Sequence, residues 1–187
     1  MVAYFGGSVA NLFLTGNIML DDDGLTPILM DMGSLAPSPT PITSRSQAIA
    51  VQDEAGEHST MPYRAPELFD VQTGKTIDTK VDIWSLGCTI YACLVGKSPF
   101  EARSEQSGGS LTMCIMGGDW RWPDEPGKKG SAANGTRSDS FSEGVKEVVR
   151  QCLKVEPSER PDVDQLMQLV KDAIAQLPET DDDILDG

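Results

Sequence analysis

The most continuous apolar stretch of the chain is residues 81–96, VDIWSLGCTIYACLVG, in which Asp82 is the only charged residue. Apolar or small side chains occupy every helical face, which is typical of a helix buried on all sides. These 16 residues are fewer than the roughly 18 to 20 that a bilayer crossing requires. Gly96, Lys97 and Pro99 close the stretch. We therefore expect the central helix of one globular domain and no transmembrane segment.

Residues 17–31, NIMLDDDGLTPILMD, form two short apolar runs around an acidic turn, the pattern of a β-hairpin. The two ends of a hairpin lie side by side, so Asn17 and Asp31 are expected to meet at its open end. Residues 21–24 lack the alternating acids and closing glutamate of a calcium-binding EF-hand loop. They are interpreted as a solvated turn.

The segments between these elements carry weaker patterns. The Pro, Ser and Thr residues of 33–41 argue against regular structure. Residues 44–57 have moderate helical propensity and predict one or two helical turns before Gly56; both segments are expected to form a long, mobile surface stretch. Residues 108–123, GGSLTMCIMGGDWRWP, predict a short apolar helix followed by Trp120 and Trp122, which are interpreted as core residues in preference to an aromatic binding surface.

The C-terminal third of the chain predicts a flexible insertion, two helices and a tail. Residues 124–140 are read as the insertion. One helix is expected from about Ser142 to Lys154, and a second begins at Pro161. The second helix places six apolar residues at core spacing: Val163, Leu166, Met167, Val170, Ile174 and Leu177. The acidic residues 177–187 are expected to be a disordered tail.

Composition narrows the classes of function. With 187 residues, of which 39% are hydrophobic, the chain is expected to form one domain. A formal net charge of −14 argues against binding to nucleic acids or anionic membranes. The four cysteines form no CxxC pair and there is one histidine, which argues against a zinc site or a Ser-His-Asp triad. Cysteines within 81–96 are expected to act as small hydrophobic residues, which favours reduced thiols and an intracellular location.

Five short motifs occur in the order and approximate spacing of a protein kinase C-lobe. They are Gly16-Asn17-Ile18, Asp31-Met32-Gly33, Tyr63-Arg64-Ala65-Pro66-Glu67, Asp82-Ile83-Trp84-Ser85-Leu86-Gly87 and Arg160-Pro161. Over residues 16–176 the chain resembles the serine/threonine kinases. The stretches LMDMGS, SRSQA and YRAPELFDV make it most similar to the Numb-associated group and its acylated, Golgi-associated branch. The implied fold is mainly α, a kinase C-lobe with one small β-hairpin and the N-lobe absent.

The resemblance implies roles for individual residues. ATP and Mg²⁺ are the implied cofactors, with Asn17 and Asp31 as metal ligands, because phosphoryl transfer needs hard oxygen ligands beside the phosphates. Thr60, five residues before Ala65, occupies the position of a threonine in the substrate (P+1) loop. By resemblance, Glu67 and Arg160 form a buried ion pair and Asp82 holds the catalytic loop. The position of Asp82 at the start of its helix by itself predicts an N-terminal cap, and the two roles are compatible.

The chain departs from the kinase pattern at the catalytic loop. The family motif is H-R-D-x-K-P-x-N, and the position of its catalytic aspartate, five residues before Asn17, is Leu12. The lysine position is Leu14, and residues 1–16 contain no Asp, Glu, Lys, Arg or His. Neither leucine accepts a proton or stabilises a phosphate. Residues 1–15 are therefore described as an atypical apolar segment, 16–176 as a C-lobe with its activation segment at 31–67, and 177–187 as the tail.

Two functional hypotheses follow. In the first, the sequence is a truncated or mis-joined form of a kinase whose intact form transfers the ATP γ-phosphate to Ser or Thr of proteins, and the chain itself is inactive. The retention of Asn17, Asp31, Thr60, Glu67 and Arg160 favours this hypothesis. In the second, the chain is a pseudokinase-like interaction module that presents residues 108–122 or 124–140 to another protein. The expected partners are a protein substrate or partner, and self-association through the exposed N-lobe-facing surface is expected. The expected location is the cytoplasm, with Golgi association implied by the family branch alone.

Overall fold

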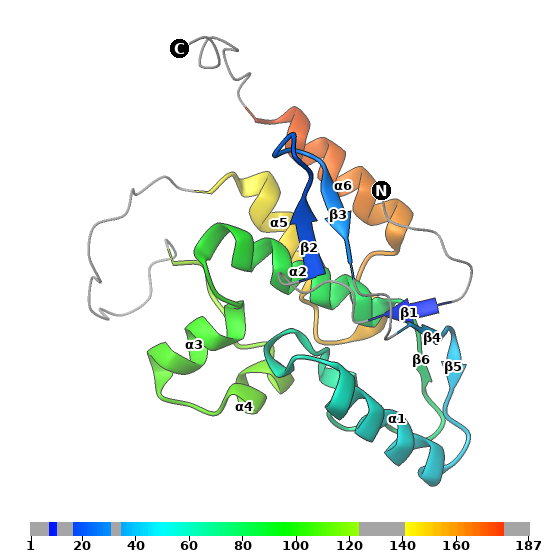
Figure 1. Cartoon of the computed structure of the whole chain (residues 1–187). Coiled ribbons are helices and arrows are strands. Elements are labelled where there is room, and N and C mark those ends of the chain that lie inside the picture. The colour runs from blue at the N-terminus through cyan, green and yellow to red at the C-terminus, as the bar shows by residue number, and fades with distance from the viewer. Residues whose placement is uncertain (1–7, 11–16, 31–34, 124–140, 178–187) are drawn as a thin grey trace, which may run out of the picture.

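The computed structural model describes residues 8–10, 17–30, 35–123 and 141–177. Helix α2 (Lys80–Val95) runs through the centre of this part (Figure 1). Nine of its residues are buried, and Trp84 and Cys88 have no exposed surface. Gly96 ends the helix with a left-handed φ of 90°, and its N–H donates to the Ala92 carbonyl at 2.8 Å. The buried central helix predicted from the sequence is confirmed.

Five further α-helices surround α2 in the described residues. They are α1 (Arg45–His58), α3 (Pro99–Ser107), α4 (Leu111–Met116), α5 (Glu143–Cys152) and α6 (Val163–Ala175). In the view of Figure 1, α5 and α6 lie above α2, whereas α1, α3 and α4 lie below it. The 3-10 helices η3 (Met61–Tyr63), η4 (Pro66–Leu68) and η5 (Pro157–Glu159) lie in the connecting segments. The described part is mainly helical, as the sequence predicted.

Two hydrophobic clusters meet on α2. The larger cluster joins α2 to α1, α3, α4 and the tryptophan segment, and its largest members are Trp84, Tyr91, Phe100, Ile115 and Trp122. The smaller cluster lies between α2, α5 and α6 and consists of Ile83, Val148, Cys152, Leu166 and Ala173. Helix α5 packs closely on α2 at Gly87, where an added Cβ would lie 2.6 Å from Cys152 Cβ.

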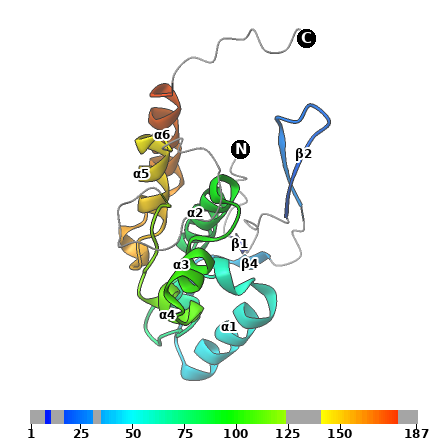
Figure 2. The ribbon, with the colours of Figure 1, turned by 90° about the vertical axis from the view of Figure 1, so that its left-hand side faces the viewer.

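Strands form short antiparallel pairs in the described residues. The predicted hairpin is β2 (Ile18–Leu20) and β3 (Pro27–Leu29), with Met19 opposite Ile28. Its acidic turn is exposed, and the Asp23 carboxylate accepts hydrogen bonds from the Leu25 and Thr26 N–H groups and from the Thr26 hydroxyl. Those hydrogen bonds lower the pKa of Asp23. Figure 2 shows the hairpin projecting away from the helices.

The structure corrects the prediction that residues 33–41 lack regular structure and that 44–57 form a mobile segment. Strand β4 (Leu35–Pro37) pairs with β1 (Ser8–Ala10), and β5 (Thr40–Pro41) pairs with β6 (Thr76–Ile77). Helix α1 has 14 residues and continues through Gly56. The Ser44 hydroxyl caps it by accepting from the Gln47 N–H, and Ala48 and Ala55 are buried in the larger cluster. The local helical propensity of 44–57 is only moderate, so packing against segments distant in sequence contributes to the stability of α1.

The last two helices confirm part of the prediction. Helix α5 lies within the expected range, but α6 begins at Val163 and not at Pro161. Asp162 is its N-cap, in a reciprocal capping box with Gln165. Of the six predicted core positions, Leu166 is buried, whereas Met167, Ile174 and Leu177 are exposed. Only one face of α6 packs against α5, so the prediction from apolar spacing assigned too many residues of this helix to the core.

The aromatic and cysteine residues occupy mostly core positions. Trp122 is 2% exposed and packs on Tyr91, with 4.8 Å between ring centroids, and on Phe141. This confirms the core interpretation for Trp122; Trp120 is half-buried beside it. Cys88, Cys114 and Cys152 are buried, and burial raises the pKa of Cys152 to about 12. Cys93 is exposed, contrary to the expectation that both cysteines of α2 are inside.

Among the residues that the structure describes, no helix has the combination of length and apolarity needed to cross a bilayer. The insertion predicted at 124–140 and the tail from 178 onwards lie outside the described residues.

Candidate functional site

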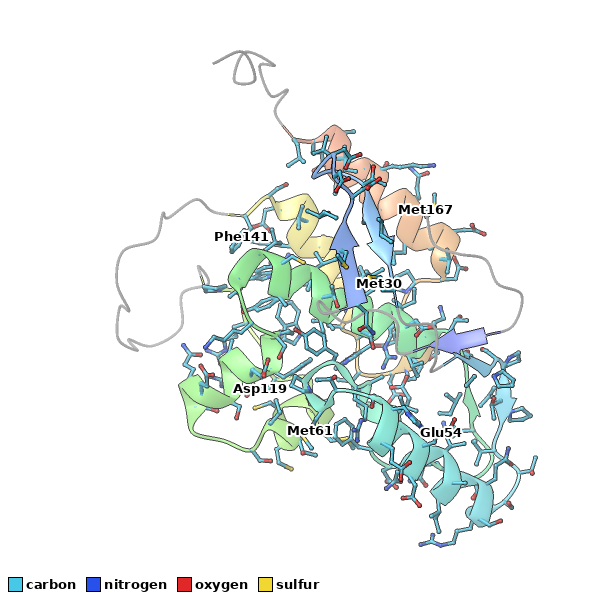
Figure 3. All side chains as sticks on the ribbon, viewed as in Figure 1. Met30, Glu54, Met61, Asp119, Phe141 and Met167 are labelled. Atoms are coloured by element: carbon cyan, nitrogen blue, oxygen red, sulfur yellow. The ribbon has the colours of Figure 1, made fainter. Side chains whose placement is uncertain are left out.

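The open end of the β2–β3 hairpin brings Asn17 next to the strand that leads to Asp31. The Met30 N–H donates to the Asn17 carbonyl at 2.8 Å. Figure 3 labels Met30 at this end of the hairpin. Asp31 itself, and the catalytic-loop positions Leu12 and Leu14, lie outside the described residues. The hairpin therefore places Asn17, one predicted metal ligand, beside Met30, the residue before Asp31, which is the other predicted ligand.

The loop that carries Thr60, residues 60–64, connects α1 to the segment before α2 and contains η3. Thr60 is exposed, and its carbonyl accepts from the Tyr63 N–H at 3.0 Å. The Tyr63 carbonyl accepts from the Ser85 hydroxyl of α2 at 2.9 Å. This bond anchors one end of the loop to the buried helix. Figure 3 labels Met61 in this loop.

Arg64 anchors the same loop to the C-terminal end of α1. Its Nε donates to Ser59 Oγ at 2.5 Å, and its Nη2 donates to the Ser59 carbonyl at 3.0 Å and the Gly56 carbonyl at 3.2 Å. The guanidinium also lies over the Phe69 ring, 5.0 Å from its centroid. Partial burial lowers the pKa of Arg64. The 60–64 loop is thus held from both sides.

The ion pair predicted between Glu67 and Arg160 is present. Arg160 Nη1 and Nη2 donate to the two carboxylate oxygens of Glu67 at 2.7 and 2.8 Å. The Arg160 side chain has no exposed surface, and that of Glu67 is 17% exposed. The two residues are separated by 93 positions in sequence, so the pair joins the segment after the Thr60 loop to the start of α6.

Arg160 has a hydrogen-bond acceptor for every guanidinium N–H. Besides Glu67, its acceptors are the carbonyls of Lys80 at 2.9 Å, Lys154 at 2.8 Å and Val155 at 2.9 Å. An arginine offers five N–H donors, so this buried cation is fully satisfied. Its guanidinium also lies 4.9 Å from the Trp84 ring centroid. Arg160 therefore fixes the N-terminal end of α2 relative to α5 and α6.

Asp82 lies in the first turn of α2 and is partly buried. The N-cap of this helix is Thr79, so the prediction that Asp82 is the cap is wrong. The chain enters α2 through a helical turn at Thr79, which starts the helix before Asp82. The loop that Asp82 is predicted to hold lies outside the described residues.

The structure thus brings Glu67 and Arg160 to the N-terminal end of α2, which carries Asp82. Thr60 is connected to α2 through Tyr63, whose carbonyl accepts from Ser85. Sequence reasoning assigned no role to Arg64, although it lies within the YRAPE motif, or to Ser85 and Lys80. A signal for Ser85 was present, because a hydroxyl inside a helix apolar on all faces needs a partner. Lys80 donates from Nζ to the Arg160 carbonyl at 2.7 Å, and no local pattern indicates this contact.

Comparison with known proteins agrees with this arrangement. Residues 15–170 match the family model described as the protein kinase domain. The chain is 36% identical over 156 residues to the serine/threonine-protein kinase ENV7 of Saccharomyces cerevisiae and 36% identical over 170 residues to ppk13 of Schizosaccharomyces pombe. It is 32% identical over 151 residues to human serine/threonine-protein kinase 16.

These alignments cover 83%, 91% and 81% of the chain, respectively. They cover 39%, 44% and 44% of the three relatives, so the chain spans less than half the length of the curated relatives it matches. The family model covers most of the described residues, including the Thr60 loop and the Glu67–Arg160 pair. The chain therefore belongs to the protein kinase family, and its relatives are serine/threonine-protein kinases.

Proposed function

We propose that the chain supplies the C-lobe of a serine/threonine kinase whose intact form transfers the ATP γ-phosphate to protein hydroxyl groups. The single observation that carries this proposal is the 60–64 loop, anchored on α2 by Ser85 and on α1 by Arg64 within the matched family region. In this proposal Thr60 faces the acceptor residue of a protein substrate. The Glu67–Arg160 ion pair holds the segment that directly follows the 60–64 loop. Asp82 supports the catalytic loop.

The residues at the hairpin end fit a magnesium site in their donor chemistry. Amide and carboxylate oxygens are hard ligands of the kind that Mg²⁺ takes beside nucleotide phosphates. Asn17 and Asp31 would hold the ion, and the Met30 to Asn17 hydrogen bond supports their proximity. Bound Mg²⁺ supplies charge neutralisation for the transferred phosphoryl group. The chain's own contribution is to position the metal ligands and the substrate loop.

The 187-residue chain by itself is expected to transfer no phosphate, because Leu12 occupies the position of the catalytic aspartate. The test compares this chain with a chimera in which residues 1–16 are replaced by the N-terminal part of the ppk13 kinase, up to the position before Asn17. Both are incubated with Mg-ATP and a generic protein substrate, and phosphate incorporation is measured. We expect activity in the chimera alone, and loss of that activity in its Asp31→Ala variant. A chimera that folds and binds ATP but transfers no phosphate would contradict the proposal.

The second candidate function is a pseudokinase-like interaction module, which is favoured by Leu12 and Leu14 at the two catalytic positions. Helix α4 offers a surface for such a role, since Met113 is 71% exposed. A folded, inactive chimera would support this second function. By resemblance alone, we place the chain in the Numb-associated group and its Golgi-associated branch, acting in the cytoplasm.

We further propose self-association through the N-lobe-facing surface, defined here by the hairpin residues Met19, Leu20, Ile28 and Met30. All four are exposed, between 43% and 59%. The variant Met19→Lys with Ile28→Glu places a charged pair across the two strands, where these residues are register partners. We expect sedimentation velocity to show oligomers of the unmodified chain and monomers of this variant. Met113→Lys on α4 serves as the control and should leave the oligomers intact; monomeric unmodified chain would refute self-association.

A further inference from the structure

Helix α1 is held to the domain by a small apolar face. Only Ala48 and Ala55 of its 14 residues are buried, and Val51 is partly buried against the larger cluster. Two alanine methyl groups contribute little burial free energy compared with leucine or phenylalanine side chains. Polar contacts at defined points must therefore contribute to keeping α1 in place. One is Gln52, whose Oε1 accepts from the Val71 N–H at 3.3 Å.

The C-terminal end of α1 is closed by Ser59 and Arg64. The last carbonyls of a helix lack partners within the helix. The Ser59 hydroxyl and N–H both donate to the Ala55 carbonyl, and Arg64 Nη2 donates to the Gly56 carbonyl. A cation at this end also interacts favourably with the helix dipole. Arg64 is thus an external cap that comes from the substrate-facing loop and not from α1.

The same arginine is fixed from the loop side. Its backbone N–H donates to the Met61 carbonyl at 3.2 Å, and its guanidinium lies over Phe69. The carbonyl of the preceding residue, Tyr63, accepts a hydrogen bond from the Ser85 hydroxyl of α2. Any movement of the C-terminal end of α1 therefore acts on Arg64, and through Arg64 on the loop that carries Thr60.

We propose that Arg64 is a positioning residue that latches α1 to the 60–64 loop, so that docking of α1 controls the conformation of this loop. The inference that the loop faces a protein substrate rests on the proposed kinase function, whereas the mechanical coupling does not. Docked α1 holds the loop in the observed conformation, and undocked α1 releases it.

The first test measures hydrogen exchange by mass spectrometry in the full chain and its Arg64→Met variant. Loss of the charged hydrogen bonds is expected to accelerate exchange about tenfold or more at residues 55–64. Exchange in α5 and α6 should stay unchanged. Arg103→Met is the matched control, because Arg103 likewise pairs through Nε, with Asp119 at 2.8 Å, and this pair joins α3 to the segment after α4. Equal rates at 55–64 in Arg64→Met and the unmodified chain, or a uniform acceleration throughout, would overturn the proposal.

The second test probes the coupling from the far end of α1. Ala48→Glu places a charge on the buried face, whereas Ile49→Glu changes a neighbour that is 49% exposed. The latch predicts faster exchange at the Tyr63 and Arg64 amides in Ala48→Glu but not in Ile49→Glu. Acceleration confined to residues near position 48 would show that α1 and the loop are independent. Neither test requires phosphoryl transfer, so failure of the latch is distinguishable from failure of the proposed kinase function.

Discussion

Replacing Glu67 by alanine is expected to lower the free energy of unfolding by about 3 to 5 kcal/mol, because it leaves the buried Arg160 guanidinium without its counter-charge. Arg160 has no exposed side-chain surface, so water does not replace the lost carboxylate without disrupting the surrounding packing. Urea unfolding followed by tryptophan fluorescence measures the effect, since Trp84 lies directly against Arg160.

The control for this prediction is Glu105→Ala, which removes an exposed ion pair with Lys97. Exposed pairs contribute little, so the unfolding midpoint should barely change. A Glu67→Ala variant as stable as the control would mean that Arg160 is not buried as a cation in the way described.

A double variant, Glu67→Leu with Arg160→Met, tests whether the ion pair or the hydrogen bonds from Arg160 to backbone carbonyls contribute more to stability. Apolar residues often replace a buried ion pair without loss of stability. Here Arg160 also donates to the carbonyls of Lys80, Lys154 and Val155, which would lose this donor. We therefore expect the double variant to stay less stable than the unmodified chain.

Replacing Gly87 by alanine is expected to destabilise the domain by about 1 to 3 kcal/mol, even though alanine is the better helix former by about 1 kcal/mol. The added Cβ would lie 2.6 Å from Cys152 Cβ and 3.1 Å from Leu153 Cδ2, so α5 must move away from α2. The shorter contact is to the Cβ of Cys152, which cannot move without its backbone, whereas the Leu153 contact is to a terminal methyl group. Thermal or urea unfolding of the full chain measures the change.

Gly56→Ala is the matched control for Gly87→Ala, because it makes the same substitution in helix α1. A Cβ at Gly56 would have no atom within 4 Å. Helix propensity then acts alone, and a small gain of up to about 1 kcal/mol is expected. Stabilisation by both substitutions would show that α2 and α5 are not closely packed at Gly87.

Much of the central architecture was predictable from local patterns and from the kinase resemblance. The apolar faces of 81–96 predicted α2, and the two apolar runs around the acidic turn predicted β2 and β3. The resemblance to protein kinases implied that Glu67 and Arg160 would pair, and they do. The length of the helix in the polar segment 44–57 was underestimated, because α1 depends on Ala48 and Ala55 packing against residues that are distant in sequence.

Of the contacts around the candidate site, the Glu67–Arg160 pair was predicted, whereas those of Arg64 were not. Thr60, Glu67 and Arg160 were identified from motifs, whereas the role of Arg64 depends on the end of α1 reaching it. The assignment of Asp82 as a cap failed because Thr79 already begins the helix. Hydrogen bonds between separate elements depend on how those elements are placed in the fold, and residue spacing in the sequence does not predict that placement.

The sequence by itself determined the central helix α2 and the β2–β3 hairpin of this protein, because apolar periodicity and turn chemistry act over a few neighbouring residues. The tertiary structure decided which of those surfaces are covered: it buried Leu166 and left Ile174 61% exposed on the same helix. It also paired residue 40 with residue 77 and Arg160 with Glu67. Burial and pairing depend on contacts between residues far apart in the chain, and these form only when the whole domain packs.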